Sequence, residues 1–214
     1  MPSRPAAALF DIGNVLLGVD FVRGLLPLVP AEVDDPRKRL KSLLEKREDF
    51  ESGRLNQDTF VKWASSRLGF VGSHEEFRHA WNSIFDPIRE MWPILAFLRS
   101  LRIKLILFSN TNCMHAEWLL QHYPVFEQFE GSIFSHEVGS CKPDPAIYHH
   151  AMSRYGLTPR DTLYVDDLKE NIETGENLGF RCHQYARSRH LEFVTWLKGQ
   201  LGVIDGWPRR PLSP

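Results

Sequence analysis

The 214-residue sequence has few cysteines, no excess of charge of one sign and no long hydrophobic run. Its three cysteines (Cys113, Cys141 and Cys182) are widely spaced without a C-x-x-C pair, which predicts reduced thiols in an intracellular protein. The 26 Lys and Arg and the 27 Asp and Glu give a formal net charge of −1, so no global field attracts nucleic acid or an anionic membrane. No segment approaches the roughly 18 apolar residues of a membrane span, and the N-terminus lacks the apolar stretch of a secretory signal.

These absences predict a soluble cytoplasmic globule that binds neither nucleic acid nor membrane, as a monomer or weak homodimer. Hydrophobic residues make up 43% and charged residues 25%, as in an ordinary globular chain. The composition therefore excludes disordered, collagen-like and coiled-coil proteins. The length is suitable for one domain with an insert, or for two small domains.

Short apolar runs that stop at polar residues predict the buried strands of a parallel sheet. These runs span residues 6–10, 103–108 and 162–165, with weaker ones at 132–134 and 180–185. Helical patterns lie between the later runs, for example from Asp144-Pro145 to Gly156. Thr111 and Ser188 are the expected N-caps of two further helices. Strands that alternate with helices predict a Rossmann-like α/β core with a parallel sheet.

The segment between the first two strong strands predicts helices instead. Helix-opening residues occur at Asp35, Asn56 and Ser73, and Ser73 forms a capping-box pattern with Glu76. Apolar residues at helical spacing then continue from Phe77 to Phe85. We expect an α/β core of residues 1–16 and 91–205, an inserted all-helical cap of residues 17–90, and a loose tail of residues 206–214.

Polar residues follow the carboxyl ends of the strong strands. Asp11 follows the first, Ser109-Asn110 the second and Asp166-Asp167 the third. Ligands of open parallel sheets bind beyond this edge, so we expect these side chains to lie close together. Lys142, just before a predicted helix, can face the same edge. Carboxylates with a lysine predict a site for Mg²⁺ and phosphate, in which a carboxylate can serve as a covalent nucleophile.

Four motifs resemble those of the haloacid dehalogenase-like (HAD) superfamily, in that family's order. They are Phe10–Val15, Leu107–Asn112, Lys142-Pro143-Asp144, and Val165-Asp166-Asp167 with Asn171. Asp11–Leu16, Glu51-x-Gly53-Arg54-Leu55 and Ser109–Asn112 are similar in particular to the bacterial sugar-phosphatase branch related to α-D-glucose-1-phosphate phosphatase. The resemblance implies a Mg²⁺-dependent phosphatase that acts on a small phosphorylated metabolite, with a sugar phosphate as the expected class.

The resemblance also implies a role for each motif residue. Asp11 is the nucleophile that forms an aspartyl-phosphate, and Lys142 is the second catalytic residue. Ser109, Asn110 and Lys142 bind the phosphoryl group. Asp11, Asp166 and the backbone carbonyl of Gly13 hold Mg²⁺, while Asp167 and Asn171 support them.

The chain departs from the common phosphatase pattern of this family at Gly13. Most family phosphatases carry an Asp there as general acid/base, a contribution typically worth ~10²–10⁴-fold. The nucleophile, the metal ligands and the phosphate ligands remain. Two alternatives to a phosphatase stay open, namely a non-catalytic phosphosugar-binding relative and a phosphomutase-type phosphotransferase.

Overall fold

A computed structural model describes residues 4–202, so the expected tail at 206–214 lies outside the described residues. Its centre is a five-stranded sheet in the order β5-β4-β1-β6-β7, in which every neighbouring pair is parallel. The strands are β1 (Ala7–Phe10), β4 (Lys104–Ser109), β5 (Gly131–Phe134), β6 (Thr162–Asp166) and β7 (Arg181–Gln184). The predicted α/β fold is confirmed, and each expected strand is present.

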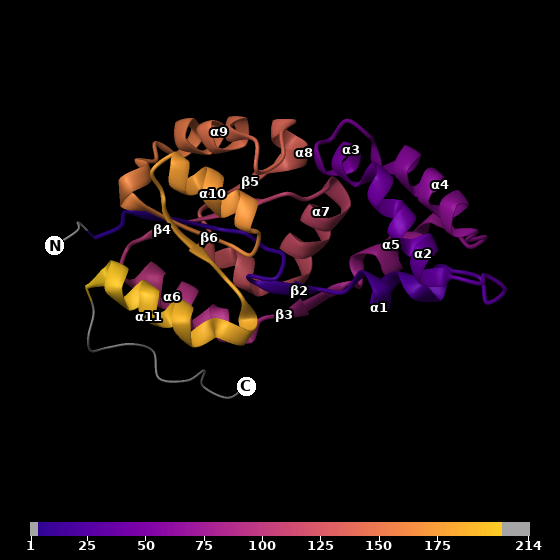
Figure 1. The fold of residues 1–214 in the computed structure, drawn as a ribbon, viewed down its shortest axis with the longest axis horizontal. Coiled ribbons are helices and arrows are strands. Elements are labelled where there is room, and N and C mark those ends of the chain that lie inside the picture. The colour runs from indigo at the N-terminus through magenta and orange to yellow at the C-terminus, as the bar shows by residue number, and fades with distance from the viewer. Residues whose placement is uncertain (1–3, 203–214) are drawn as a thin grey trace.

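Alternating side chains of the sheet pack into two separate hydrophobic layers. Phe10, Leu107 and Val165 enter one layer with α6 (Trp92–Ser100) and α11 (His190–Leu201). The intervening Leu9, Phe108 and Tyr164 enter the other, with α9 (Pro145–Tyr155) and α10 (Lys169–Asn177). Helices therefore cover both faces of the sheet (Figure 1). Burial on both faces explains why these strands read as continuous apolar runs.

Local capping signals located most helix ends correctly. The carboxylate of Asp144 caps α9, which ends at Gly156 in the left-handed conformation, and Ser73 and Glu76 form the predicted capping box. The prediction for Ser188 was wrong, because this residue lies within a 3₁₀ turn (Arg187–Arg189) that leads into α11 without a side-chain cap.

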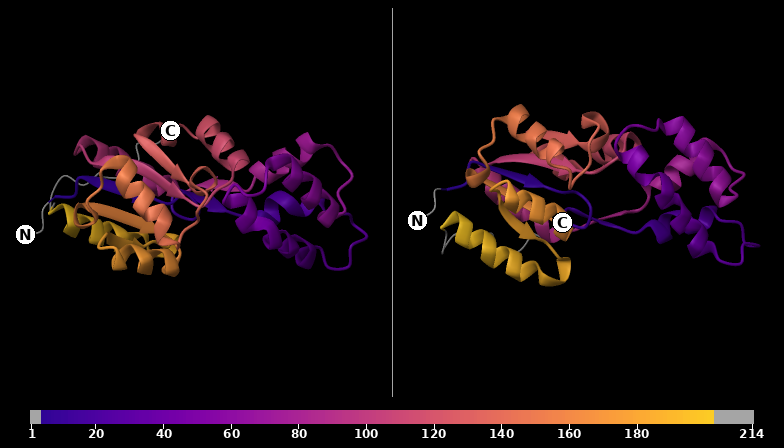
Figure 2. Two further views of the ribbon diagram at one scale, coloured as in Figure 1. Left: turned by 90° about the horizontal axis from the view of Figure 1, so that it is seen from above. Right: turned by 45° about the horizontal axis from the view of Figure 1, so that its top comes forward.

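Helices from the inserted segment lie beyond one end of the strands of the sheet, around their own hydrophobic cluster (Figures 1 and 2). We call residues 21–82 the helical block. Its helices are α1 (Phe21–Leu25), α2 (Pro36–Lys41), α3 (Arg47–Glu51), α4 (Gln57–Leu68) and α5 (His74–Asn82), with 3₁₀ turns at Leu26–Leu28 and Ser42–Lys46. None of the helices between residues 4 and 202 combines the length and apolar character needed to cross a bilayer.

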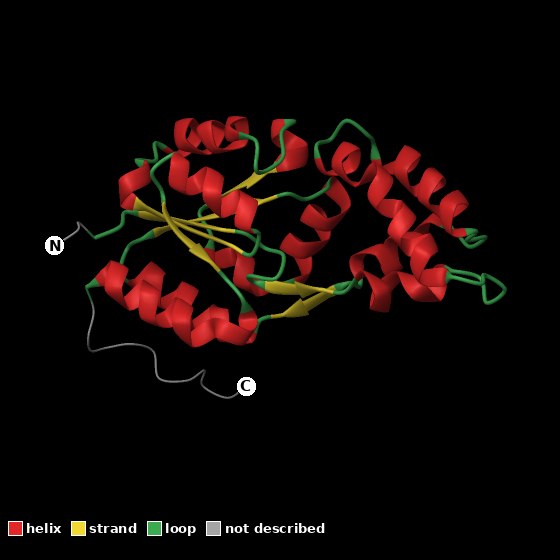
Figure 3. Ribbon diagram, viewed as in Figure 1, coloured by secondary structure: helices red, strands yellow, loops and turns green. Residues whose placement is uncertain are grey.

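Two short antiparallel strands connect the block to the sheet (Figure 3). β2 (Leu17–Val19) pairs with β3 (Phe85–Pro87), and the apolar pattern that predicted helix up to Phe85 is interrupted after Asn82. Pairing between the outgoing and returning chains satisfies their backbone hydrogen bonds, a non-local interaction that outweighs the helical periodicity.

The remaining elements surround the sheet edge. They are α7 (Cys113–His122), α8 (Ser135–Val138), and 3₁₀ turns at Arg89–Met91, Pro124–Gln128 and Pro159–Asp161. The loop after α3 rests directly on α8. Gly53 has a left-handed φ of 74°, and a Cβ there would overlap the carbonyl oxygen of His136. The Ser135 hydroxyl also donates a hydrogen bond to the carbonyl oxygen of Glu51.

We expect Gly53→Ala to lower the free energy of unfolding by more than the cost of a left-handed alanine alone. Gly139 is a matched control because it is also left-handed, with a φ of 79°, but a Cβ there would meet nothing within 4 Å. Both substitutions carry the left-handed penalty, and overpacking adds about 1–3 kcal/mol at Gly53 only. Urea unfolding of both variants measures the difference. Equal losses of unfolding free energy would show that α3 and α8 are not in tight contact.

Candidate active site

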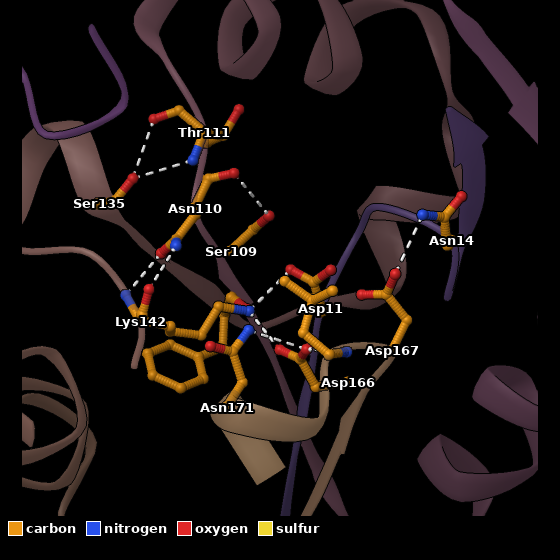
Figure 4. A network of polar contacts seen from close by, with 12 residues as sticks. Asp11, Asn14, Ser109, Asn110, Thr111, Ser135, Lys142, Asp166, Asp167 and Asn171 are labelled. Carbon is orange, nitrogen blue, oxygen red and sulfur yellow. Dashed lines mark hydrogen bonds and ion pairs between the residues drawn. The ribbon is translucent and has the colours of Figure 1, made fainter. Parts of the chain in front are cut away.

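Three carboxylates meet at the carboxyl edge of the sheet (Figure 4). Asp11 follows β1, and Asp166 and Asp167 lie at the end of β6, the strand paired with β1. One oxygen from each lies within 4.8 Å of the others. We call Asp11, Asp166 and Asp167 the acidic cluster. The parallel pairing brings together residues that are more than 150 positions apart.

Lys142 joins the acidic cluster from the loop before α9. Its Nζ donates to Asp11 Oδ1 at 2.8 Å, to Asp166 Oδ2 at 2.6 Å and to the carbonyl oxygen of Phe108 at 2.8 Å. The residue is only 4% exposed. Burial alone would favour the neutral amine, but the two carboxylates raise the pKa of Lys142 above its ordinary value.

Asn110 positions Lys142 through its side chain. Its Oδ1 accepts from the Lys142 backbone N–H at 2.7 Å, and its Nδ2 donates to the Lys142 carbonyl at 2.8 Å. One N–H of the amide and its oxygen are thus engaged with Lys142, and the second N–H of Nδ2 has no acceptor within residues 4–202. The expected phosphate contact of Asn110 stays a prediction.

Asp166 is fully buried and has no free lone pair. Its carboxylate accepts from Lys142, from the Tyr164 hydroxyl at 2.7 Å, from the Leu168 N–H at 2.9 Å and from Asn171 Nδ2 at 2.9 Å. Four hydrogen bonds fill the acceptor capacity of a carboxylate. Burial opposes ionisation, but Lys142 outweighs it and lowers the pKa of Asp166, which stays ionised.

Asp167, in contrast, opens onto a cavity. Burial raises the pKa of Asp167, and its hydrogen-bonding side-chain partner is Asn14, whose Nδ2 donates to Oδ2 at 3.0 Å. Asn14 is held in the left-handed region with a φ of 53°. In this structure Asp167 is the more accessible of the two carboxylates, and Asp166 holds Lys142. The assignment of Asp166 to the metal and of Asp167 to its support stays a prediction, because one oxygen of each carboxylate in the acidic cluster lies close enough to share an ion.

The acidic cluster carries more negative charge than Lys142 can balance. Burial, and next the charge of Asp166, raise the pKa of Asp11 to about 7 against the attraction of Lys142. In addition, the buried Oδ1 of Asn171 has no hydrogen-bond partner within residues 4–202. Unbalanced carboxylates and an unpaired oxygen are the donor set that a hard cation with its bound water prefers.

The cavity in front of the acidic cluster has a volume of about 260 Å³. Gly13, Ser109 and Thr111 contribute to its wall. The Ser109 hydroxyl makes a single long contact of 3.5 Å within the described chain, so it is available to a ligand. Thr111 is not the expected helix cap, because Asn112 caps α7 and the Thr111 N–H donates to Ser135 at 2.9 Å.

Gly13 itself faces the cavity without a positive φ. A Cβ there would meet Val19 Cγ2 at 3.5 Å and Asp11 Oδ2 at 3.7 Å, which are ordinary contacts. The backbone therefore does not require glycine at this position. The structure leaves the site without a side-chain proton donor two residues after Asp11.

The helical block contributes cavity residues that the sequence did not identify. Arg47 and Glu51, one turn apart on α3, both line the cavity, and Arg47 Nε donates to both Glu51 oxygens at 3.0 Å. Burial raises the pKa of Glu51. A spacing of four residues places two side chains on one face of a helix, but no local pattern shows which way that face points.

His115 also lines this cavity but is fixed as a neutral group. Its Nε2 donates to the Trp81 carbonyl at 3.0 Å, and its Nδ1 lies 3.0 Å from the Asn112 amide. Burial lowers the pKa of His115 to about 4. With both nitrogens engaged, His115 cannot exchange a proton with a ligand in this conformation.

Comparison with known proteins identifies a family that this chain matches. The model of the haloacid dehalogenase-like hydrolase family matches residues 5–179, a range that includes the acidic cluster, Lys142 and the helical block. The chain is 27% identical over 186 residues to a D-ribitol-5-phosphate phosphatase of Bacteroides thetaiotaomicron, covering 82% of this chain and 89% of that protein. It is 26% identical over 177 residues to the sesquiterpene phosphatase astK of Aspergillus oryzae, covering 81% and 86% respectively.

A solved structure of a HAD family enzyme from Bacteroides thetaiotaomicron has the same fold. It superposes with a TM-score of 0.78 at 22% identity and covers 90% of this chain and 99% of that one. A further structure of that enzyme holds magnesium and inorganic phosphate.

The raised pKa of Asp11 predicts a pH-dependent stability difference between the metal-free protein and its Asp11→Asn variant. A carboxyl whose pKa rises from 3.8 to about 7 on folding stabilises the fold below pH 3.8, and this contribution is lost as the pH rises through 7. The variant lacks the titration, so its stability relative to wild type should rise by about 2 kcal/mol between pH 5 and pH 8.

Urea unfolding in EDTA measures this difference. Asp58→Asn, at an exposed side chain, should show the same offset at both pH values. A constant offset for Asp11→Asn would contradict the electrostatic account.

Proposed function

We infer that this chain, which belongs to the haloacid dehalogenase-like hydrolase family, is a Mg²⁺-dependent phosphatase that hydrolyses a small phosphomonoester through an aspartyl-phosphate on Asp11. One observation carries the proposal. Lys142 connects Asp11 and Asp166 at the floor of a cavity that also presents the free hydroxyl of Ser109.

Asp11 is the nucleophile in this proposal. Lys142 holds its Oδ1, while Oδ2 accepts no hydrogen bond from residues 4–202. Oδ2 attacks phosphorus, and the bond from phosphorus to the alcohol oxygen breaks. Water then cleaves the aspartyl-phosphate and releases inorganic phosphate. Lys142 favours the ionised form of Asp11 against the effect of burial and orients its carboxylate. Such positioning is most of what a protein contributes to phosphoryl transfer.

Ser109 and the backbone N–H of Asn110 bind the phosphoryl oxygens. Lys142 contributes positive charge next to them, although its three N–H groups already have acceptors. The proton for the leaving alcohol comes from a group other than residue 13. Glu51 is the titratable carboxyl that the helical block contributes to this cavity.

Asp11, Asp167 and the carbonyl of Gly13 would hold Mg²⁺, since they face the cavity and form an under-neutralised oxygen set. When bound, the ion neutralises charge on the transferring phosphoryl group. Asp166 acts indirectly, because its four hydrogen bonds fix Lys142 and the loop to Leu168. Asn171 holds Asp166 in place.

The helical block acts as a cap in this proposal. Residues 17–90 close over a core of residues 1–16 and 91–205, and the contact between the α3 loop and α8 keeps the cavity covered during the reaction. Exclusion of water strengthens each charge interaction in the site.

The comparisons leave the alcohol part of the substrate open. One relative is named for a polyol phosphate and another for a sesquiterpene. A sugar phosphate is supported by the motif resemblance and by a further relative, from Thermotoga maritima, that is named for phosphorylated carbohydrates. The cytoplasmic location and the monomer or weak homodimer remain predictions.

Replacing the nucleophile tests the central claim. Asp11→Asn preserves the shape of the side chain but not its nucleophilicity, so kcat for phosphate release from a phosphomonoester panel should fall by at least about 10³-fold. EDTA should abolish the wild-type rate, and Mg²⁺ should restore it. The exposed control Asp58→Asn should retain activity. Equal rates for Asp11→Asn and wild type would refute the assignment, and transfer of label within a sugar bisphosphate without phosphate release would indicate a phosphotransferase instead.

The roles of the two adjacent carboxylates can be separated by Mg²⁺ titration. Asp167→Asn should raise the Mg²⁺ concentration needed for half of the maximal thermal stabilisation by about 10–100-fold, because a direct ligand is lost. Asp166→Asn should lower the melting temperature of the metal-free protein, because Lys142 loses one of its two carboxylate partners, and should shift the Mg²⁺ midpoint less. A larger midpoint shift for Asp166→Asn would restore the assignment made from the sequence.

A further inference from the structure

A second cavity lies inside the helical block. Its volume is about 220 Å³, and its wall includes the buried apolar residues Leu25, Leu40, Leu43, Phe50, Phe60 and Trp81. The exposed residues Arg37, Lys41 and Leu44 also line it, so the cavity is open to solvent on that side. An apolar wall in contact with water favours an apolar ligand group that leaves water on binding.

The apolar cavity adjoins the cavity of the active site. Phe21, Arg47 and Glu51 line both of them. The boundary is thus one aromatic ring and one ion pair, with Glu51 only 14% exposed. The shared lining places the second cavity next to the cavity in which Asp11 would bind a phosphoryl group.

The polarity changes sharply from one cavity to the other. The site cavity holds Asp11, Asp167 and Ser109, whereas the wall of the second cavity is mostly apolar, with Arg37, Lys41 and Asn112 as its polar residues beyond the boundary. A sugar or polyol that entered it would place most of its hydroxyl groups against apolar side chains, which costs free energy for each one that lacks a hydrogen bond. An apolar group would gain from leaving water.

We propose that the cavity of the helical block receives the apolar part of the substrate, so that the substrate is the phosphate monoester of an apolar alcohol and not a sugar phosphate. This inference rests on the proposed phosphatase activity. A cavity of about 150 Å³ suffices for benzene, so 220 Å³ accommodates an aromatic ring or a short branched chain.

Benzyl phosphate and glycerol 1-phosphate test the inference, since both are esters of primary alcohols and differ in the polarity of the alcohol. Wild type should show at least a tenfold higher kcat/KM for benzyl phosphate. Leu43→Trp fills the cavity and should remove that preference by raising KM for benzyl phosphate, with kcat within about twofold, because the cavity binds ground state and transition state alike. The rate for glycerol 1-phosphate should change little.

Leu28→Trp is the matched control. Leu28 is buried in the same hydrophobic cluster as Leu43 but does not line the cavity, so this variant should keep the preference. If Leu43→Trp does not fold, Leu40→Ala tests the same point, because a larger cavity should shift the preference toward 1-naphthylmethyl phosphate.

The outcomes separate this inference from the proposed function. Asp11-dependent hydrolysis of both esters without a preference, or with a preference for glycerol 1-phosphate, would overturn the inference and leave the phosphatase intact. A preference that Leu43→Trp and Leu40→Ala do not change would also overturn it. Hydrolysis of neither ester, nor of any other phosphomonoester, would overturn both.

Discussion

The buried contact of Lys142 with Asp11 and Asp166 is the interaction on which the site depends. Two carboxylates so close to each other could not both remain ionised without a cation between them. Lys142 provides that charge, and each of its three donor N–H groups has an acceptor. Because the contact joins the ends of β1, β4 and β6 to the loop before α9, it also fixes the edge of the sheet where the chemistry takes place.

The strength of that interaction depends on a second group of residues that hold the ion pair from behind. Asn110 holds the backbone of Lys142, and Tyr164 and Asn171 hold Asp166. A buried ion pair is favourable only when its remaining lone pairs and protons find partners. These contacts use all the acceptor sites of the Asp166 carboxylate, while the neighbouring Asp167 carboxylate remains open to the cavity.

The helical block completes the cavity and adds a different kind of surface. Its α3 helix brings Arg47 and Glu51 over the acidic cluster, and the close approach of Gly53 to α8 holds that helix in place. Arg47 and Glu51 separate the charged cavity of the active site from the mostly apolar cavity of the helical block. This arrangement suits an amphipathic ligand whose phosphate faces the sheet and whose apolar part faces the block.

The sequence by itself determined the strands, most of the caps and the meeting of Asp11, Ser109, Lys142 and Asp166 at one edge, because buried parallel strands and helix starts are encoded by local patterns. Only the tertiary structure decided which hydrogen bonds Asp166 and Asp167 each make. Adjacent residues point in different directions, and the partners of each come from distant segments. The same holds for the side chain of Asn110, for the pairing of β2 with β3, and for the orientation of Arg47 and Glu51. The cavity in the block could not be predicted from the sequence, because an empty volume depends on how separate helices pack and not on any one residue.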